Sequence, residues 1–402
     1  MLNPNFGYGL RLMTLVVAVA ISGQVTAEVD LGLSDPTVEE TSTASPGVYD
    51  EYIVFGQSAA FEGPAAALGQ RLHLGIQIAF EEINAAGGVH GRRLELITRN
   101  DGYEPELAIQ NTRALLEEEQ VFALIGGVGT PTSRAVLPIT DAAKVPYIAP
   151  FTGAGFLRDP ASYVVNLRAS YEQETRAITQ HLLNDLKLTR IAVVYQNDSY
   201  GQVGLRGMQK AMQESGRELV AIGAYPRNTK AVKTALLDVI KGSPEAIVII
   251  GAYEPTAELI LWAEKIELQS LFFTISFVGS QALASALGEK GRGVYVSQVV
   301  PTPDSVDLPV AKQYRAALAQ YADNEGQGFV SFEGYLAGRM TIKLLEQAGR
   351  NLTRAKFMDA MRATRVEDLS GFTLMFGETD NQGSDQVFLT MIGADQRYQA
   401  LP

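Results

Sequence analysis

The chain has 402 residues, of which 46% are hydrophobic and 19% charged, so it contains enough apolar material for one large domain or two ordinary ones. Its formal net charge of −12 argues against nucleic acid or an anionic membrane surface as a partner. The count of zero cysteines argues against disulfides, thiolate metal sites and lipid attachment through an N-terminal cysteine. Composition therefore predicts a globular protein that is stabilised by packed cores.

The first residues have the pattern of a secretory signal. Arg11 precedes the uncharged stretch 12–21, and small residues follow up to Ala27. The apolar run falls well short of the ~20 residues of a membrane-spanning helix, so the pattern favours a cleaved signal over an anchor. We predict a signal peptide over 1–27, cleavage after about Ala27, and a mature protein outside the cytoplasm. The acidic segment 28–51, rich in Ser, Thr and Pro, is predicted to be a flexible leader.

From residue 52 onward, apolar runs typical of strands alternate with helical patterns. The first series has expected strands at 52–55, 94–97, 121–125, 145–148 and 164–166, and expected helices at 68–83, 105–116 and 131–143. The second has expected strands at 191–195, 219–222, 246–250, 271–275 and 294–299, and expected helices at 171–186, 200–215, 229–240, 255–266 and 281–287. Helices at 308–321, 329–347 and 353–362 and short strands at 373–376 and 387–392 complete the chain. This spacing predicts an α/β fold with parallel sheets covered on both faces.

The turn after the third expected strand is the first candidate for ligand binding, because ligands of open α/β sheets lie beyond the carboxyl ends of the strands. Glycines there allow close approach, Thr130 and Thr132 offer hydroxyls as helix caps, and Pro131 suits a first helical position. A helix N-terminus of this kind attracts a carboxylate. An ordinary helix cap has the same pattern, so both interpretations stay open.

Three later turns are also candidates. The loop 149–156 is rich in small residues and carries aromatics, while Tyr200 and Tyr253 follow two strands of the second series. A tyrosine can cover an apolar ligand with its ring and form a hydrogen bond with its hydroxyl. Packing between domains is the alternative role for each of these aromatics.

Patterns of catalysis and of cofactor binding are missing from the sequence. It has no Gly-x-Ser-x-Gly elbow, and its glycine-rich turn matches neither a dinucleotide fingerprint nor a P-loop. His73, His90 and His181 are not at metal-ligand spacing. We therefore predict that the protein is not an enzyme and has no catalytic residues, no metal and no cofactor.

Five short motifs occur together in the chain: Gly63-Pro64, the helix end 83–91, Asn100-Asp101, the turn 125–127, and Tyr200-Gly201. On these motifs the chain, from about Tyr52 to the C-terminus, resembles the periplasmic leucine/isoleucine/valine-binding family of ABC importer components. The resemblance implies a periplasmic location for the mature protein.

This resemblance implies a type I periplasmic-binding fold: two doubly wound parallel-sheet lobes, joined by three crossovers, that close over a ligand by hinge motion. The crossovers are expected near 166–170, 298–302 and 369–373. Lobe 1 would contain residues 52–167 plus 302–370. Lobe 2 would contain residues 168–301 plus 371–402.

The resemblance also implies most of the ligand-binding residues. Thr130, with Thr132 close by, would take a ligand carboxylate. Phe151 would supply a backbone carbonyl. Gly153 falls where the family has a threonine hydroxyl, which the neighbouring Thr152 could replace.

In the second lobe, Tyr200 and Tyr253 match two tyrosines of the family's site. Two positions depart from the family's pattern. The acid that pairs with a ligand ammonium falls on or near Ser276, and a first-lobe aromatic falls on Leu68.

A buried ammonium without a carboxylate partner would cost several kcal/mol. Either Glu172 or Glu254 therefore supplies the charge, or the ligand has no ammonium, and the balance favours a small carboxylate or a polar solute compatible with aromatic side chains. We expect a monomeric solute-binding protein that captures an amino-acid-like or carboxylate ligand and delivers it to an ABC permease complex in the inner membrane. A sensory binding protein that presents its ligand to a membrane receptor is the first alternative, and a periplasmic α/β enzyme is the second.

Overall fold

The computed structural model describes residues 45–322 and 325–401, which belong to one compact unit, 43–402. The predicted signal peptide lies outside the described residues. So does the predicted leader up to residue 44. The end of that leader is packed: Val48 is buried and pairs with Ile53, and Gly47 accepts a hydrogen bond from the N–H of Val54. The prediction of a flexible segment up to residue 51 is thus wrong for these last residues.

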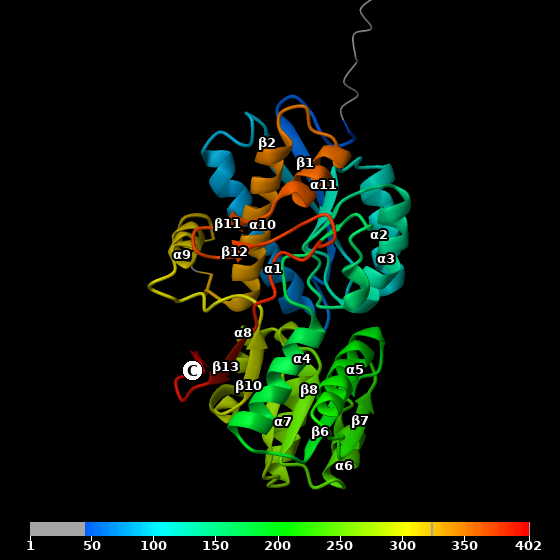
Figure 1. Ribbon diagram of the computed structural model, residues 1–402, viewed down its shortest axis with the longest axis vertical. Helices are drawn as coiled ribbons and strands as arrows, with labels where there is room; N and C mark the ends of the chain where they lie inside the picture. Colours follow the sequence, from blue (N-terminus) through cyan, green and yellow to red (C-terminus); the bar gives the residue numbers. More distant parts are fainter. Residues whose placement is uncertain (1–44, 323–324, 402) are drawn as a thin grey trace, which may run out of the picture. The chain divides into compact units, whose positions relative to one another are not determined.

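The first sheet has five parallel strands in the order β2-β1-β3-β4-β5. Its strands are β1 (Tyr52–Ala59), β2 (Arg93–Asn100), β3 (Ala123–Ile125), β4 (Tyr147–Ile148) and β5 (Val164–Val165). The helices that connect or follow them are α1 (Ala66–Ala85), α2 (Pro105–Glu117), α3 (Thr130–Ala142), α9 (Pro309–Tyr321), α10 (Phe329–Ala348) and α11 (Arg354–Ala363). In Figure 1 the elements up to β5 run from blue through cyan to green, α9 is yellow, and α10 and α11 are orange.

The second sheet has seven strands in the order β14-β13-β10-β9-β8-β6-β7. Its strands are β6 (Ile191–Gln196), β7 (Ala221–Tyr225), β8 (Ala246–Ile250), β9 (Leu271–Thr274), β10 (Tyr295–Gln298), β13 (Phe388–Ile392) and β14 (Tyr398–Ala400). Its helices are α4 (Tyr171–Gln180), α5 (Ser199–Glu214), α6 (Lys233–Ile240), α7 (Tyr253–Lys265) and α8 (Ser280–Leu287). A small antiparallel pair joins β11 (Glu367–Asp368) to β12 (Thr373–Leu374).

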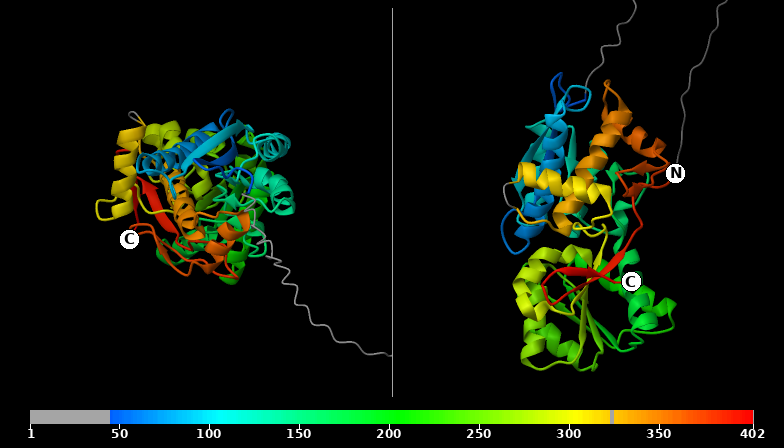
Figure 2. Two further views of the ribbon diagram at one scale, coloured as in Figure 1. Left: turned by 90° about the horizontal axis from the view of Figure 1, so that it is seen from above. Right: turned by 90° about the vertical axis from the view of Figure 1, so that its left-hand side faces the viewer.

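The predicted α/β class is confirmed, with two local differences. β13 and β14 are antiparallel to their neighbours, and Figures 1 and 2 show the red β13 beside β10. The helix expected from residue 229 begins at Lys233, because Asn228 has a positive φ and the hydroxyl of Thr229 donates to the carbonyl of Pro226 in a turn.

The boundaries of the two lobes stay a prediction. The first sheet ends close to Asn166, whose N–H donates to the carbonyl of Asn381 and whose carbonyl accepts from the N–H of Gly383. The chain joins the second sheet only at Phe388, the first residue of β13. The last passage toward the second sheet therefore lies closer to 384–387 than to the expected 369–373.

Helices α1 and α10 are in close contact, and Figure 1 shows them side by side. Gly75 of α1 permits this contact, because a Cβ there would lie 1.9 Å from the carbonyl oxygen of Ser331. Gly334 of α10 is equally constrained, since its Cβ would lie 2.2 Å from the carbonyl oxygen of Leu72. Backbone contact between these helices fixes the position of the first turn of α10.

We therefore expect Gly75→Ala to destabilise the protein by about 1–3 kcal/mol, although alanine is the better helix former. Urea unfolding followed by circular dichroism measures this change. Gly155→Ala is the matched control, because a Cβ at Gly155 meets no atom within 4 Å. Equal stability of the two variants would contradict the close packing of α1 on α10.

Candidate ligand-binding site

The turn between β3 and α3 depends on glycines with positive φ. Gly129 has φ 99°, and a Cβ there would lie 2.1 Å from the ring of Tyr103. Thr130 begins α3, and Pro131 stands in its first turn as predicted. The hydroxyls do not cap this helix. Instead, Thr130 Oγ1 lies 2.7 Å from Thr152 Oγ1, whereas Thr132 donates to the carbonyls of Val128 and Gly129.

The turn after β4 contacts the start of α4. The carbonyl of Gly153 accepts a hydrogen bond of 2.8 Å from the N–H of Tyr171, the first residue of α4. A Cβ at Gly153 would lie 2.6 Å from that same nitrogen. The glycine that replaces the expected threonine is therefore required by Tyr171, while Thr152 points its hydroxyl at Thr130.

An aromatic cluster joins the strand ends of both sheets. Phe277, in the short helix Ser276–Val278 after β9, lies at its centre. The ring centroid of Phe277 is 4.5 Å from that of Tyr200, 5.6 Å from that of Phe151 and 5.9 Å from that of Tyr103. The ring of Tyr171 lies 5.5 Å from Tyr200. Tyr103 and Phe151 follow strands of the first sheet, so side chains from both sheets form one buried surface.

Arg168, which follows β5, places a guanidinium in this buried region with 1% of its surface exposed. Its Cζ lies 4.5 Å from the ring centroid of Phe151, a cation–π geometry. Its Nε lies 3.0 Å from Oε1 of Glu333 in α10, and its Nη2 donates to the hydroxyl of Ser276 at 2.5 Å. One cation thus contacts three segments that are far apart in the sequence.

Ser276 lies between Arg168 and a second buried acid, Glu174. The Ser276 hydroxyl donates to Glu174 Oε1 at 3.0 Å, and the Ser276 N–H donates to Glu174 Oε2 at 2.8 Å. The hydroxyl of Ser297 donates to the same Oε2 at 2.6 Å. The carboxylate of Glu174 therefore orients Ser276, whose hydroxyl accepts from Arg168.

Burial governs the protonation of these groups. It raises the pKa of Glu333 to about 7, against the opposing attraction of Arg168. It also raises the pKa of Glu174, again against Arg168 and the serine hydrogen bonds. Burial alone would lower the pKa of Arg168, but Glu333 and Glu174 raise it on balance, so the guanidinium stays charged.

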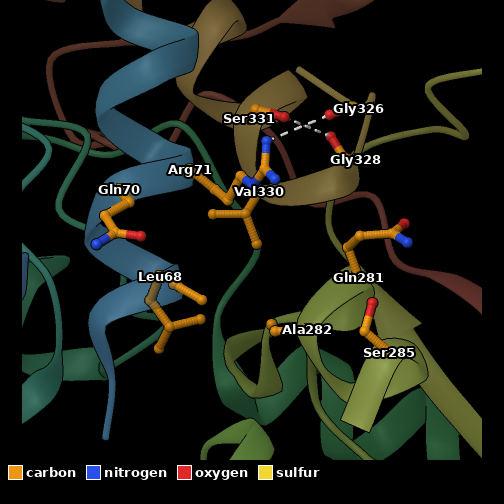
Figure 3. Close-up of a pocket in the computed structure, with 12 residues that line it drawn as sticks. Leu68, Gln70, Arg71, Gln281, Ala282, Ser285, Gly326, Gly328, Val330 and Ser331 are labelled. Carbon is orange, nitrogen blue, oxygen red and sulfur yellow. Dashed lines mark hydrogen bonds between the residues drawn. The ribbon is translucent and has the colours of Figure 1, made fainter. Parts of the chain in front are cut away.

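Leu68 and Tyr253 lie at the start of α1 and of α7. A Cβ at Gly279 would lie 2.5 Å from Leu68 and 3.7 Å from Tyr253, which places all three together. Leu68 also lines a cavity of about 180 Å³ between α1, α8 and the start of α10, with Arg71, Gln281 and Ser331 on its walls (Figure 3).

The two acids that the sequence offers for a ligand ammonium lie in surface ion pairs. Glu172 pairs with Arg176 at 3.3 Å and with Lys210 at 2.5 Å. Glu254 pairs with Lys230 at 3.3 Å. Within the described ranges, no group of three or more histidines or acids could hold a metal ion, and no helix is long and apolar enough to cross a membrane.

The family model for periplasmic binding proteins matches residues 53–397, which is most of the chain. The chain belongs to the periplasmic binding protein family. The resemblance to leucine/isoleucine/valine-binding proteins and the type I periplasmic-binding fold are thereby confirmed. Members of this family bind solutes, in agreement with the predicted function class.

Relatives of this periplasmic binding protein agree with that assignment. Over 233 residues it is 30% identical to the Leu/Ile/Val-binding protein homolog 7 of Brucella abortus, a match that covers 54% of this chain and 56% of the relative. The chain thus spans just over half the length of the curated relatives that it matches.

Two solved structures match a larger share of this chain. The crystal structure of "a possible leucine/isoleucine/valine-binding protein" from Rhodopirellula baltica has a TM-score of 0.84 and 36% identity, and the match covers 88% of this chain and 96% of that one. A substrate-binding periplasmic protein from Ralstonia solanacearum has a TM-score of 0.82 and 26% identity over 87% of this chain and 99% of that one.

Of the predicted site residues in this binding protein, six gather around the aromatic cluster: Thr130, Phe151, Thr152, Gly153, Tyr200 and Ser276. The sequence interpretation did not include Arg168, Tyr171, Glu174, Phe277 or Glu333. Glu333 had one detectable signal, because it is the only charged residue in the apolar run 329–338. An acid in such a run is expected to have a buried cation as its partner.

The raised pKa of Glu333 predicts a pH dependence of stability. Between about pH 4.5 and pH 7 the native protein binds more protons at this group than the unfolded chain does, so its contribution to the free energy of unfolding falls as pH rises. We expect this fall to be roughly 1–3 kcal/mol. Glu333→Gln should remove it, so that the difference between wild type and variant changes across this interval in urea unfolding.

Glu346→Gln is the control, because Glu346 lies on the same helix and its side chain is 41% exposed. Stability curves of wild type and Glu333→Gln that stay parallel from pH 4.5 to pH 7 would contradict the protonation of Glu333 in the native state.

Proposed function

We propose that this periplasmic binding protein captures a small amino-acid-like or carboxylate solute between its two predicted lobes and delivers it to an ABC permease complex in the inner membrane. The observation that best supports this proposal is the buried aromatic cluster, to which the strand ends of both sheets contribute. In it, Phe277 lies against Phe151 and Tyr103. A ligand held by side chains of both sheets stabilises the closed arrangement over any open one. Such a ligand-dependent shape is what a permease can distinguish.

The relatives support this proposal. The Brucella abortus protein is called a Leu/Ile/Val-binding protein homolog, and a neighbour from Thermomonospora curvata is called a fatty acid ABC transporter substrate-binding protein. The latter is 23% identical to this chain and shares its fold. The signal-like pattern that ends near Ala27 supports export to the compartment in which such proteins work.

The hydroxyl pair formed by Thr130 and Thr152 provides the first test. A thermal-shift screen over amino acids, short-chain carboxylates, aromatic acids and amides identifies a ligand, because a hundredfold excess over Kd stabilises by about 2.7 kcal/mol. Thr130→Val keeps the shape and removes the hydroxyl, so we expect a loss of affinity of about 5- to 10-fold in calorimetry.

Thr140→Val is the matched control. Thr140 lies on the same helix, is buried, and donates to the carbonyl of Leu137. Unchanged affinity of Thr130→Val would remove the turn after β3 from the site.

Delivery to an importer has a separate test. Cells that lack this protein should lose high-affinity uptake of the radiolabelled ligand found in the screen, and uptake should return with the wild-type chain. Complementation with Thr130→Val should raise the half-saturating concentration, because capture limits uptake at low solute. Full uptake without the protein, alongside intact binding in vitro, would contradict delivery to an importer.

A further inference from the structure

Arg168 has hydrogen-bonding capacity that the protein does not use. Its Nη2 donates to Ser276 and, at 3.4 Å, to Oε2 of Glu333, whereas its Nε faces Oε1 of Glu333 without hydrogen-bond geometry. Its Nη1 is buried and has no partner among the described residues. The Cζ of this guanidinium lies 4.5 Å from the ring centroid of Phe151, and that ring offers Nη1 no oxygen acceptor. One donor of this buried cation is therefore left without an acceptor.

Two buried phenols beside Arg168 also lack partners. The hydroxyl of Tyr200 has no hydrogen bond among the described residues, and the hydroxyl of Tyr171 lies near Thr152 without hydrogen-bond geometry. Both side chains are fully buried, and both lie within electrostatic reach of Arg168. Buried hydroxyls are nearly always paired in native proteins. Three unpartnered donors in one buried cluster indicate an acceptor-rich group that they would share.

The buried acids are not free to receive an ammonium. Glu174 already accepts three hydrogen bonds, two from Ser276 and one from Ser297. Glu333 faces Arg168. A ligand ammonium in this cluster would meet a fixed cation instead of an open carboxylate, and like charges at short range repel strongly at low dielectric.

A basic groove adjoins the cluster. It has a volume of about 660 Å³, and its charged lining consists of one acid, Glu172, and five cations: Arg134, Arg158, Arg176, Arg206 and Lys210. It shares Gly153 with the cluster, and Arg158 donates to the carbonyl of Arg168. On a chain with a net charge of −12, such a concentration of positive charge raises the local concentration of anions.

We infer that the ligand is an anion without an adjacent ammonium, a carboxylate held by Arg168 and by the hydroxyls of Tyr171 and Tyr200. This inference rests on the proposed function and specifies its ligand class. The ligand's carboxylate supplies the acceptors for the three unpartnered donors. An α-amino acid, whose ammonium stands beside its carboxylate, is disfavoured by the same cation.

The first experiment compares carboxylates with matched neutral and zwitterionic compounds. The probes are 4-methylpentanoate, phenylacetate and succinate, each with its amide and with leucine, phenylglycine or aspartate respectively. Wild-type protein is screened by thermal shift at roughly 10 mM, and each hit is measured by calorimetry. We expect at least one acid to bind, and its amide and amino acid to bind at least about tenfold more weakly.

The second experiment removes single hydroxyls. Tyr171→Phe and Tyr200→Phe should leave the melting temperature of the ligand-free protein unchanged or slightly raised, because an unpartnered buried hydroxyl is lost. Each should weaken binding of the acid by roughly 5- to 30-fold. Arg168→Lys, which keeps the charge opposite Glu333, should weaken it by tenfold or more.

Thr112→Val is the matched control, because Thr112 is also fully buried with an unpartnered hydroxyl but lies on α2, outside the aromatic cluster. Its affinity for the acid should equal that of wild type. Wild-type affinity in both Tyr171→Phe and Tyr200→Phe would overturn the inference, as would an amide or amino acid that binds as tightly as its acid. A panel in which no compound shifts the melting temperature counts against the proposed function, and with it against this ligand class.

Discussion

The burial of the Arg168 guanidinium is the constraint on which the arrangement of the site depends. Removal of such an ion from water is unfavourable by several kcal/mol unless countercharges and hydrogen bonds compensate it. The compensation comes from Glu333 in α10 and from Ser276 after β9, with Glu174 behind Ser276. These groups are 108 and 165 residues from Arg168 in the sequence. None of the three segments can shift without exposing an uncompensated charge.

Close backbone contacts at glycines hold the segments that surround the buried Arg168 guanidinium in place. Gly75 and Gly334 let α1 and α10 approach until backbone touches backbone, which fixes the helix that carries Glu333. Gly153 lets the turn after β4 touch the first residue of α4, close to Glu174. Glycines, which offer no side chain to a ligand, therefore determine where the buried charges lie.

Most of the fold could be predicted from the sequence, because alternating apolar runs and helical periods report burial along a single element. The features that were not predicted depend on contacts with residues elsewhere in the chain. Val48 looked like leader because its segment is polar, yet it pairs with Ile53. β14 is short and mostly exposed, and it forms a strand because it pairs with the edge of β13.

The candidate site was predictable only in part, for the same reason. Thr130 and Thr152 follow adjacent strands, so strand order alone brings them together. Strand order could not predict which acid enters the site. Glu172 and Glu174 are two residues apart, which on a helix turns their side chains about 200° from each other. Glu172 consequently pairs with Arg176 and Lys210 at the surface, whereas Glu174 is buried under Ser276.

The unpartnered donors give a physical reason for coupling ligand capture to closure. Each buried polar group without a partner destabilises the arrangement described here by about 1–3 kcal/mol, and Arg168, Tyr171 and Tyr200 each contribute one. Moving a two-state equilibrium from 1:99 to 99:1 takes about 5.5 kcal/mol of differential affinity. A carboxylate that satisfies all three donors supplies a difference of this order. Under the proposed function, the same three donors would also keep a closed form scarce until a carboxylate binds.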